Sequence, residues 1–181
     1  MNYTKSLVFA ALFTALIIGG TFVKIPIGPV PIVLATLFVL LAGLVLDTAW
    51  AAASVGLYLA LGAVGLPVFA SGGGIAYFSG PTGGYLIGYL VAVVAVNLIS
   101  SARVGSVIRD VIAVVVGSLL IYVIGVPWLK VALERSWTDT FAIGLTPFLL
   151  GDAIKAAVAL SVFTALKRLY PELIPRCPRS E

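Results

Sequence analysis

Long runs of apolar residues alternate with short polar or proline- and glycine-rich breaks along this chain of 181 residues. Crossing a hydrocarbon layer about 30 Å thick takes roughly twenty apolar residues in a helix. Membrane-spanning strands instead alternate apolar and polar residues over about ten positions, and these runs show no such alternation. The pattern therefore predicts one six-helix transmembrane domain over residues 1–181, with spans at residues 7–23, 30–46, 49–66, 84–100, 107–126 and 147–169.

The composition supports the placement of these helices in lipid. Hydrophobic residues make up 61% of the chain and charged residues only 10%, with a mean hydropathy of +1.19. A soluble domain carries about a quarter charged residues, because it must cover its surface with polar groups. In lipid, every backbone polar group must be satisfied within the protein, which helices achieve. The chain is therefore predicted to be an all-α membrane protein.

The distribution of lysine and arginine predicts the orientation of the helices. With the N-terminus inside, the cytoplasmic side carries Lys5, Arg103, Arg109, Lys167, Arg168, Arg176 and Arg179. The outer side then carries Lys24, Lys130 and Arg135. Because cytoplasmic loops are enriched in basic residues, both termini are predicted to be cytoplasmic. The net charge of +4 is spread over loops, so we expect no nucleic acid partner.

Several kinds of chemistry are excluded by residue content. The chain has no histidine and a single cysteine, Cys177, which argues against zinc or haem sites, histidine-based catalysis and a structural disulfide. It lacks a phosphate-binding GxxxxGK[ST] motif, so it does not hydrolyse ATP itself. A Ser161–Lys155 dyad is the remaining hydrolase arrangement, and its geometry is poor. We therefore expect neither an enzyme, a metal nor a cofactor.

Two charged residues lie inside the last predicted span. Asp152 and Lys155 are three residues apart and share one face of that helix. Each charge placed in a span disfavours membrane insertion by roughly 2.5–3.5 kcal/mol. Two interpretations are open: a structural ion pair that neutralises itself, or a polar cavity in which a ligand completes the hydrogen bonding of both groups. We favour the cavity.

The outer connection at residues 67–83 is unusually apolar and rich in glycine. Irregular backbone at membrane depth is tolerated where it is buried in protein or lines a cavity. The glycines allow backbone donors to approach a ligand closely, and Tyr77, Phe78 and Tyr85 offer flat apolar walls. We predict a folded lid over a pocket; the alternative is a long flexible turn.

Small residues recur at four-residue spacing on the first predicted helix, at Ala11, Ala15 and Gly19. Such stripes let two helices approach closely in lipid. Spacing alone leaves open whether the partner helix belongs to this chain or to another. A similar face on the third helix, which includes Ala49, Ala53 and Ala60, is predicted to pack internally. Asn97, near the inner end of its span, is predicted to hydrogen-bond a neighbouring helix.

Three motifs of this chain are distinctive when taken together. They are KIPIGPVPI at residues 24–32 followed by TLFVLLAG at residues 36–43, GPTGGYLIGY at residues 80–89, and PFLLGDAIK at residues 147–155. In these motifs the chain resembles the BioY family, and the resemblance extends from about residue 7 to residue 169. BioY proteins are the biotin-binding S components of energy-coupling factor (ECF) transporters.

The resemblance implies a six-helix S-component fold that captures biotin near the outer face, under the 67–83 loop. Biotin would be the transported ligand and not a cofactor. The predicted substrate-binding residues are Asp152, Lys155, Thr82, Gly83, Tyr85, Tyr77 and Thr36; all but Tyr77, which belongs to the outer loop, lie in these motifs. Many relatives have a glutamine before the threonine of the second-helix motif, where this chain has Ala35, so a polar contact there is missing or replaced.

The resemblance also implies partners and a location. Family members work with a membrane coupling subunit and a pair of ATP-hydrolysing subunits in the cell membrane of a prokaryote. In S components a small-xxx-small motif on the first helix contacts the coupling subunit, and Ala11 and Ala15, followed by Gly19, match it. The alternatives are an S component for a different vitamin and a structural membrane subunit without a transport role.

Overall fold

The computed structural model describes residues 3–100 and 106–170. Cys177 and three of the arginines used to predict the orientation, Arg103, Arg176 and Arg179, lie outside the described residues. The helices are α1 (Tyr3–Phe22), α2 (Ala35–Val45), α3 (Thr48–Ala63), α4 (Ala76–Ser79), α5 (Gly83–Ile99), α6 (Val107–Leu133), α7 (Trp137–Gly144) and α8 (Thr146–Leu169). The strands β1 (Lys24–Ile25) and β2 (Ile32–Val33) form an antiparallel pair.

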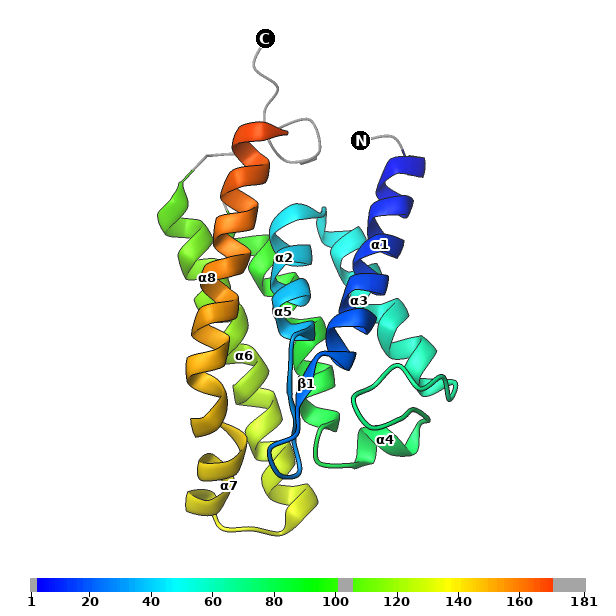
Figure 1. Ribbon diagram of the computed structural model, residues 1–181, viewed down its shortest axis with the longest axis vertical. Helices are drawn as coiled ribbons and strands as arrows, with labels where there is room; N and C mark the ends of the chain where they lie inside the picture. The colour runs from blue at the N-terminus through cyan, green and yellow to red at the C-terminus, as the bar shows by residue number, and fades with distance from the viewer. Residues whose placement is uncertain (1–2, 101–105, 171–181) are drawn as a thin grey trace.

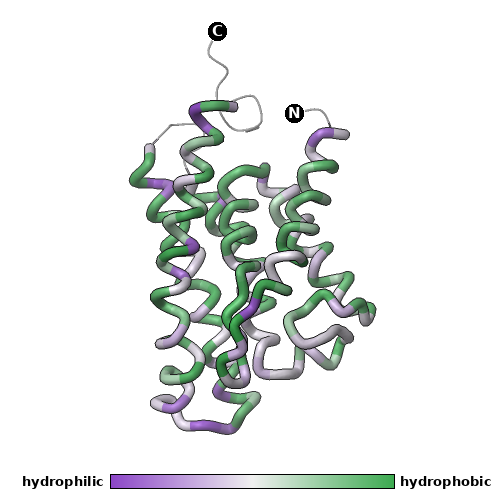
Figure 2. The backbone as a smooth tube through the Cα atoms, viewed as in Figure 1, coloured by the Kyte–Doolittle hydropathy of each residue, from purple (hydrophilic) through white to green (hydrophobic). Residues whose placement is uncertain are grey.

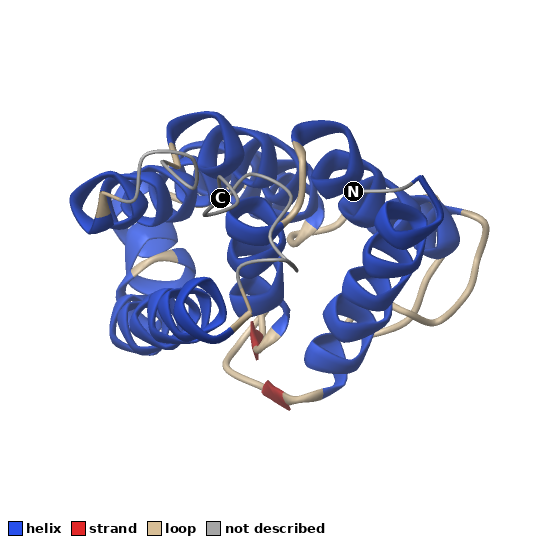
Figure 3. Ribbon diagram, turned by 90° about the horizontal axis from the view of Figure 1, so that it is seen from above, coloured by secondary structure: helices blue, strands red, loops and turns tan. Residues whose placement is uncertain are grey.

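The longer helices lie side by side, with the start of α1 and the end of α8 at the same end of the molecule (Figure 1). Seen from above, they form one group, and the two short strands lie at its edge (Figure 3). The middle of this body is mainly hydrophobic, and hydrophilic segments gather toward its two ends (Figure 2). Three helical segments of the described chain are long and apolar enough to cross a membrane: Tyr3–Phe22, Val107–Leu133 and Trp137–Leu169. Shorter apolar helices are α2, α3 and α5.

Helix α2 lies at the centre of the hydrophobic core. Ten of its 11 residues are buried, as expected for a helix that is apolar on every side. The prediction of a helix over residues 30–46 is wrong in its first part, because α2 begins only at Ala35. Before α2 the chain turns at Gly28, whose φ is +66°, and strand β2 then pairs with β1. Pro29 and Pro31 oppose a helix there, since proline removes a backbone donor.

A buried amide caps the C-terminal end of α2. Asn97 of α5 donates from Nδ2 to the carbonyls of Gly43, at 3.0 Å, and Leu46, at 2.6 Å. The hydroxyl of Thr48 at the start of α3 donates to the Oδ1 atom of the same amide. The last carbonyls of a helix have no partner within it, so Asn97 supplies donors that water cannot supply in the core. The predicted hydrogen bond between helices is confirmed.

Helix α6 is longer than the predicted span at residues 107–126, because it continues through Pro127 to Leu133. Glycines allow α5 and α6 to pack closely around this proline. A Cβ atom at Gly84 would lie 2.3 Å from Cβ of Trp128, and one at Gly125 would lie 2.4 Å from the Tyr85 ring. The packing therefore holds the helix together where one backbone hydrogen bond is missing.

Helix α7, which the sequence pattern did not predict, follows α6. The Ser136 side chain caps its start by accepting from the Asp139 backbone N–H at 3.2 Å. The other four predicted segments coincide with α1, α3, α5 and α8 to within a few residues.

The small-residue faces of α1 and α3 both lie on the outside of this chain. Ala11, Ala15 and Gly19 of α1 are exposed, and no atom lies within 4 Å of a Cβ built on Gly19. Ala49, Ala53 and Ala60 of α3 are exposed as well, so the prediction that this face packs internally is wrong. Helix α3 instead buries the opposite face, which includes Val55 and Tyr58.

Candidate ligand-binding site

A pocket lies in the half of the molecule away from the start of α1 and the end of α8. Its walls come from α1, α2, α3, α5, α6 and α8, from the β1–β2 hairpin at residues 24–33, and from the 67–83 loop. The space free of atoms is about 560 Å³, including the open mouth. Most of the lining is apolar or aromatic.

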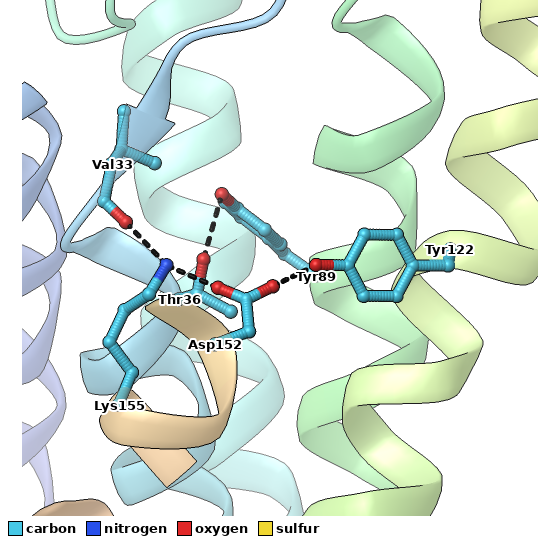
Figure 4. Close-up of polar contacts among 6 residues, drawn as sticks. All are labelled: Val33, Thr36, Tyr89, Tyr122, Asp152 and Lys155. Atoms are coloured by element: carbon cyan, nitrogen blue, oxygen red, sulfur yellow. Dashed lines mark hydrogen bonds and ion pairs between the residues drawn. The ribbon is translucent and has the colours of Figure 1, made fainter. Parts of the chain in front are cut away.

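Asp152 and Lys155 form an ion pair at one side of this pocket (Figure 4). Their side chains are only 13% and 8% exposed, so the charges are largely removed from water. Oδ1 of Asp152 faces the lysine ammonium, and Oδ2 accepts a hydrogen bond from the hydroxyl of Tyr122 on α6. Lys155 also donates to the backbone carbonyl of Val33 at 3.0 Å. The pair is therefore satisfied by neighbours from α6 and the hairpin, as buried charges require.

Hydroxyl groups provide the other polar atoms of the pocket. Thr36, at the start of α2, lies 3.5 Å from the hydroxyl of Tyr89, measured between the two oxygens. The hydroxyl of Tyr58 lies 3.3 Å from Oγ1 of Thr21. Each hydroxyl can both donate and accept. These groups can therefore exchange a partner within the protein for a partner on a ligand.

The 67–83 loop contributes an aromatic wall. Phe69 is 1% exposed, and its ring lies 4.9 Å from the Tyr77 ring and 5.3 Å from the Tyr58 ring, between centroids. Gly62 of α3 makes room for it, because a Cβ atom there would lie 2.0 Å from the phenyl ring. The loop is therefore folded against α3, as the predicted lid requires and unlike a flexible turn.

Six of the seven predicted site residues line this one pocket: Thr36, Tyr77, Thr82, Tyr85, Asp152 and Lys155. Gly83 does not line it. A Cβ atom at Gly83 would lie 1.8 Å from the backbone oxygen of Phe78, so this glycine lets the loop pass closely over the start of α5. Its position is explained by packing.

The sequence reasoning missed the tyrosines at Tyr58, Tyr89 and Tyr122, which also line the pocket. Each lies within an apolar span, where a hydroxyl group needs a partner. That requirement was the available signal, but a tyrosine in a span also packs as an ordinary aromatic residue. Which of them face a common centre depends on how α3, α5 and α6 are arranged.

This arrangement suits the binding of a small, partly apolar molecule. Aromatic rings can cover its flat or aliphatic part, while a carboxylate, an ammonium and several hydroxyls supply directed hydrogen bonds. Among residues 3–100 and 106–170, no group of three or more His, Cys, Asp or Glu side chains is placed to hold a metal ion. The Ser161–Lys155 dyad is not formed, because Ser161 is exposed and donates to the Ala157 carbonyl at 2.8 Å.

Sequence comparison identifies relatives over almost the whole chain. The sequence model of the BioY family matches residues 1–172. A probable biotin transporter BioY from Lysinibacillus sphaericus is 39% identical over 177 residues, covering 92% of this chain and 87% of the relative. The biotin transporter BioY of Thermotoga maritima is 37% identical over 169 residues, covering 93% of this chain and 99% of the relative.

The fold also has a counterpart among solved structures. The crystal structure of the S-component for biotin from an ECF-type ABC transporter superposes with a TM-score of 0.86 at 29% sequence identity. The match covers 96% of this chain and 99% of that chain. Family, relatives and fold agree with the resemblance stated from the three motifs, and they identify a component of a membrane transporter and not an enzyme. This chain belongs to the BioY family.

Proposed function

We propose that this chain is the high-affinity biotin-binding S component of an ECF-type vitamin importer. The observation that carries the proposal is the buried Asp152–Lys155 pair in an apolar, tyrosine-lined pocket of a BioY-family chain. A buried charge pair adds little stability by itself, because the cost of removing two charges from water offsets their attraction. A ligand that uses both groups gives a reason for placing them there.

Biotin fits the chemistry of this pocket. Its ureido ring carries two N–H donors and one carbonyl acceptor, its thiophane ring is apolar, and its tail ends in a carboxylate. The Asp152 carboxylate accepts from the ureido N–H groups, replacing or sharing the Tyr122 hydrogen bond. Lys155 has three N–H donors, of which two face Asp152 and the Val33 carbonyl, so one serves the ligand. That donor binds either the ureido oxygen or the biotin carboxylate.

The proposal extends to how the protein sits in the membrane. The chain crosses the cell membrane of a prokaryote six times, with α1, α2, α3, α5, α6 and α8 as the crossing helices and both termini in the cytoplasm. The pocket then opens toward the outer face, under the 67–83 loop. A membrane coupling subunit contacts the exposed Ala11, Ala15 and Gly19 face of α1, and a pair of ATP-hydrolysing subunits drives uptake.

Isothermal titration of the purified protein with biotin tests this function. We expect one saturable site per chain. A thermal-shift series with biotin, thiamine and riboflavin checks selectivity, because a ligand that binds only the folded protein raises its unfolding temperature. A shift with thiamine or riboflavin and none with biotin would identify an S component for another vitamin. Binding of none of the three overturns the proposal in favour of a structural subunit.

A further inference from the structure

The Asp152 carboxylate in the pocket is held from two sides (Figure 4). Its Oδ1 atom faces the ammonium of Lys155 on the same helix, and its Oδ2 atom accepts a hydrogen bond from the hydroxyl of Tyr122 on α6. All three residues line the pocket. The ion pair is local to α8, whereas the hydrogen bond comes from another helix. The two contacts therefore constrain the carboxylate in different ways.

An aspartate side chain does not fix the orientation of its own carboxylate. Rotation of this group is broad and roughly two-fold, so its partners set the plane in which the oxygens lie. With Lys155 as the only partner, both oxygens would turn toward the ammonium, because opposite charges attract strongly where water is excluded. The Tyr122 hydroxyl opposes this rotation by holding Oδ2 on the side away from Lys155.

The Tyr122 hydroxyl is itself held in place by neighbouring helices. Tyr122 is 8% exposed, and its ring packs edge to face against the Tyr85 ring, with the centroids 6.4 Å apart and the planes at 88°. The hydroxyl of Tyr85 donates to the Gly144 carbonyl at the end of α7, at 2.8 Å. Gly125 leaves room for the Tyr85 ring. The position of the Tyr122 hydroxyl is therefore set by packing outside α8.

We propose that Tyr122 is a positioning residue for ligand binding, whose hydroxyl keeps the Asp152 carboxylate turned toward the ligand. This inference rests on the proposed binding of biotin. A carboxylate has about four lone-pair sites, and Lys155 and Tyr122 each use one. The remaining sites meet the ureido N–H donors already oriented, so binding does not first require the ion pair to rearrange. Tyr122 keeps its hydrogen bond to Oδ2 in the complex and shares the carboxylate with the ligand.

This role differs from a direct contact between Tyr122 and the ligand. A positioning hydroxyl acts through the Asp152 carboxylate, so its removal matters much less once the carboxylate has been replaced. A hydroxyl that contacts the ligand contributes in both cases. A double-mutant cycle separates the two roles, because residues that act through one another have non-additive effects.

Titration of biotin into Tyr122→Phe, Asp152→Asn and the double variant completes this cycle. We expect Tyr122→Phe to weaken binding about three- to thirtyfold on its own, as for the loss of one hydrogen bond, and less than about twofold beside Asp152→Asn. An equal loss in both backgrounds, or no loss in either, overturns the proposal.

Tyr58→Phe is the matched control for the cycle. It removes the same atom from another tyrosine of the pocket, whose hydroxyl lies 3.3 Å from Oγ1 of Thr21. Its effect on biotin affinity should be the same with and without Asp152→Asn. If Tyr58→Phe depends on Asp152 as strongly as Tyr122→Phe does, the coupling is general to the pocket and the positioning role of Tyr122 is rejected.

A second measurement needs no ligand. In protein isotope-labelled at the aspartate carboxylates, the infrared difference between wild type and Asp152→Asn isolates the carboxylate bands of Asp152. We expect these bands to shift in the Tyr122→Phe background, because their frequencies depend on the hydrogen bonds at each oxygen, and to stay in place with Tyr58→Phe. Unshifted bands in Tyr122→Phe overturn the positioning role. Failure of the wild-type protein to bind biotin would instead reject the proposed function, so the two failures are distinguishable.

Discussion

Asp152 and Lys155 each have a polar partner in addition to one another. Tyr122 donates to the carboxylate, and the Val33 carbonyl accepts from the ammonium. The two buried charges are therefore stabilised by α6 and by the hairpin, which are both far from α8 in the sequence. The three-residue spacing on one helix predicts the pair itself. It does not predict these partners, because they depend on how α6 and the hairpin pack against α8.

The Asp152 carboxylate can be tested by a change that keeps its size. Asp152→Asn removes the charge and should weaken biotin binding about ten- to a hundredfold, since a charge-assisted hydrogen bond contributes roughly 1.5–3 kcal/mol. Because the single change leaves Lys155 without its ion-pair partner, the double variant Asp152→Asn with Lys155→Met is compared with it by titration. A folded double variant with near-wild-type affinity would reject these residues as the binding site.

The chain offers a matched control in a second buried ion pair. Asp110 on α6 is 3% exposed, pairs with Lys167 at 3.0 Å and accepts from the Ser100 hydroxyl at 2.9 Å, at the end of the molecule away from the pocket. Asp110→Asn should lower the unfolding temperature while the biotin affinity stays the same. Equal losses of affinity in both variants would mean that Asp152 acts through stability.

At the scale of single elements, the largest departure from the sequence prediction is α2. Hydropathy favours a helix from residue 30, yet residues 30–34 belong to the hairpin and its return. A hydrophobicity scan treats an apolar strand and an apolar helix alike, so the shortened helix could not be predicted from it. The prolines at positions 29 and 31 were the signal that favours the hairpin. This departure matters because the hairpin forms one wall of the pocket.

The contact between α3 and the 67–83 loop can be tested at two glycines of α3. Gly62→Ala places a methyl group against the Phe69 ring, so it should displace the loop, cost about 1–3 kcal/mol of stability and weaken biotin binding. Gly56→Ala has no atom within 4 Å of the new Cβ and should leave binding unchanged. Thermal unfolding and titration of both variants check this. If the two variants have the same stability and the same biotin affinity, the contact between the loop and α3 has no role in binding.

The exposed small residues of α1 allow a test of assembly with the coupling subunit. Ala11 and Ala15 are exposed in the single chain, so Ala11→Leu or Ala15→Leu adds bulk without disturbing its core. We expect biotin binding to survive and energised uptake with the coupling subunits to be lost, because bulk prevents close helix contact. Ala157→Leu, on an exposed position of α8, is the matched control and should permit uptake. Loss of biotin binding in the α1 variants would contradict an intermolecular role.

For the whole molecule, the described basic residues divide unevenly between its two ends. Lys5, Arg109, Lys167 and Arg168 lie on helix segments toward the end where α1 starts and α8 finishes. Lys130 and Arg135 lie at the opposite end, at and just after the finish of α6. This asymmetry favours a cytoplasmic location for the end that carries the first group.

A pair of reporter fusions tests the orientation. A reporter fused after Glu181 should be active in the cytoplasm, and one inserted near Glu134, in the connection between α6 and α7, should lie outside. Compartment-specific labelling of intact cells measures both. Labelling opposite to this at either position would reverse the predicted orientation and place the pocket on the inner side.

The helical character and most helix positions of this fold follow from the hydrophobic pattern, because apolar runs of this length have few alternatives in lipid. The close packing of α5 on α6 does not follow from it. In that packing, Gly84 leaves room for Trp128 and Gly125 leaves room for Tyr85. Each contact joins two helices, so the hydrophobic pattern of one helix does not predict it. The same packing brings Tyr89 and Tyr122 to one pocket, so these two lining residues could not be predicted from the sequence, whereas six of the seven predicted site residues do line it.

The hydrogen bond from Trp128 to Gly80 also gives the protein a natural optical probe. Indole fluorescence changes when its N–H partner or the polarity around the ring changes, and here that partner belongs to the loop over the pocket. The chain has three tryptophans, and the other two, Trp50 and Trp137, lie on α3 and α7. Replacing those two with phenylalanine leaves a single emitter beside the loop. The emission of that one indole then follows the loop in unlabelled protein, in detergent or in vesicles, as ligand is added.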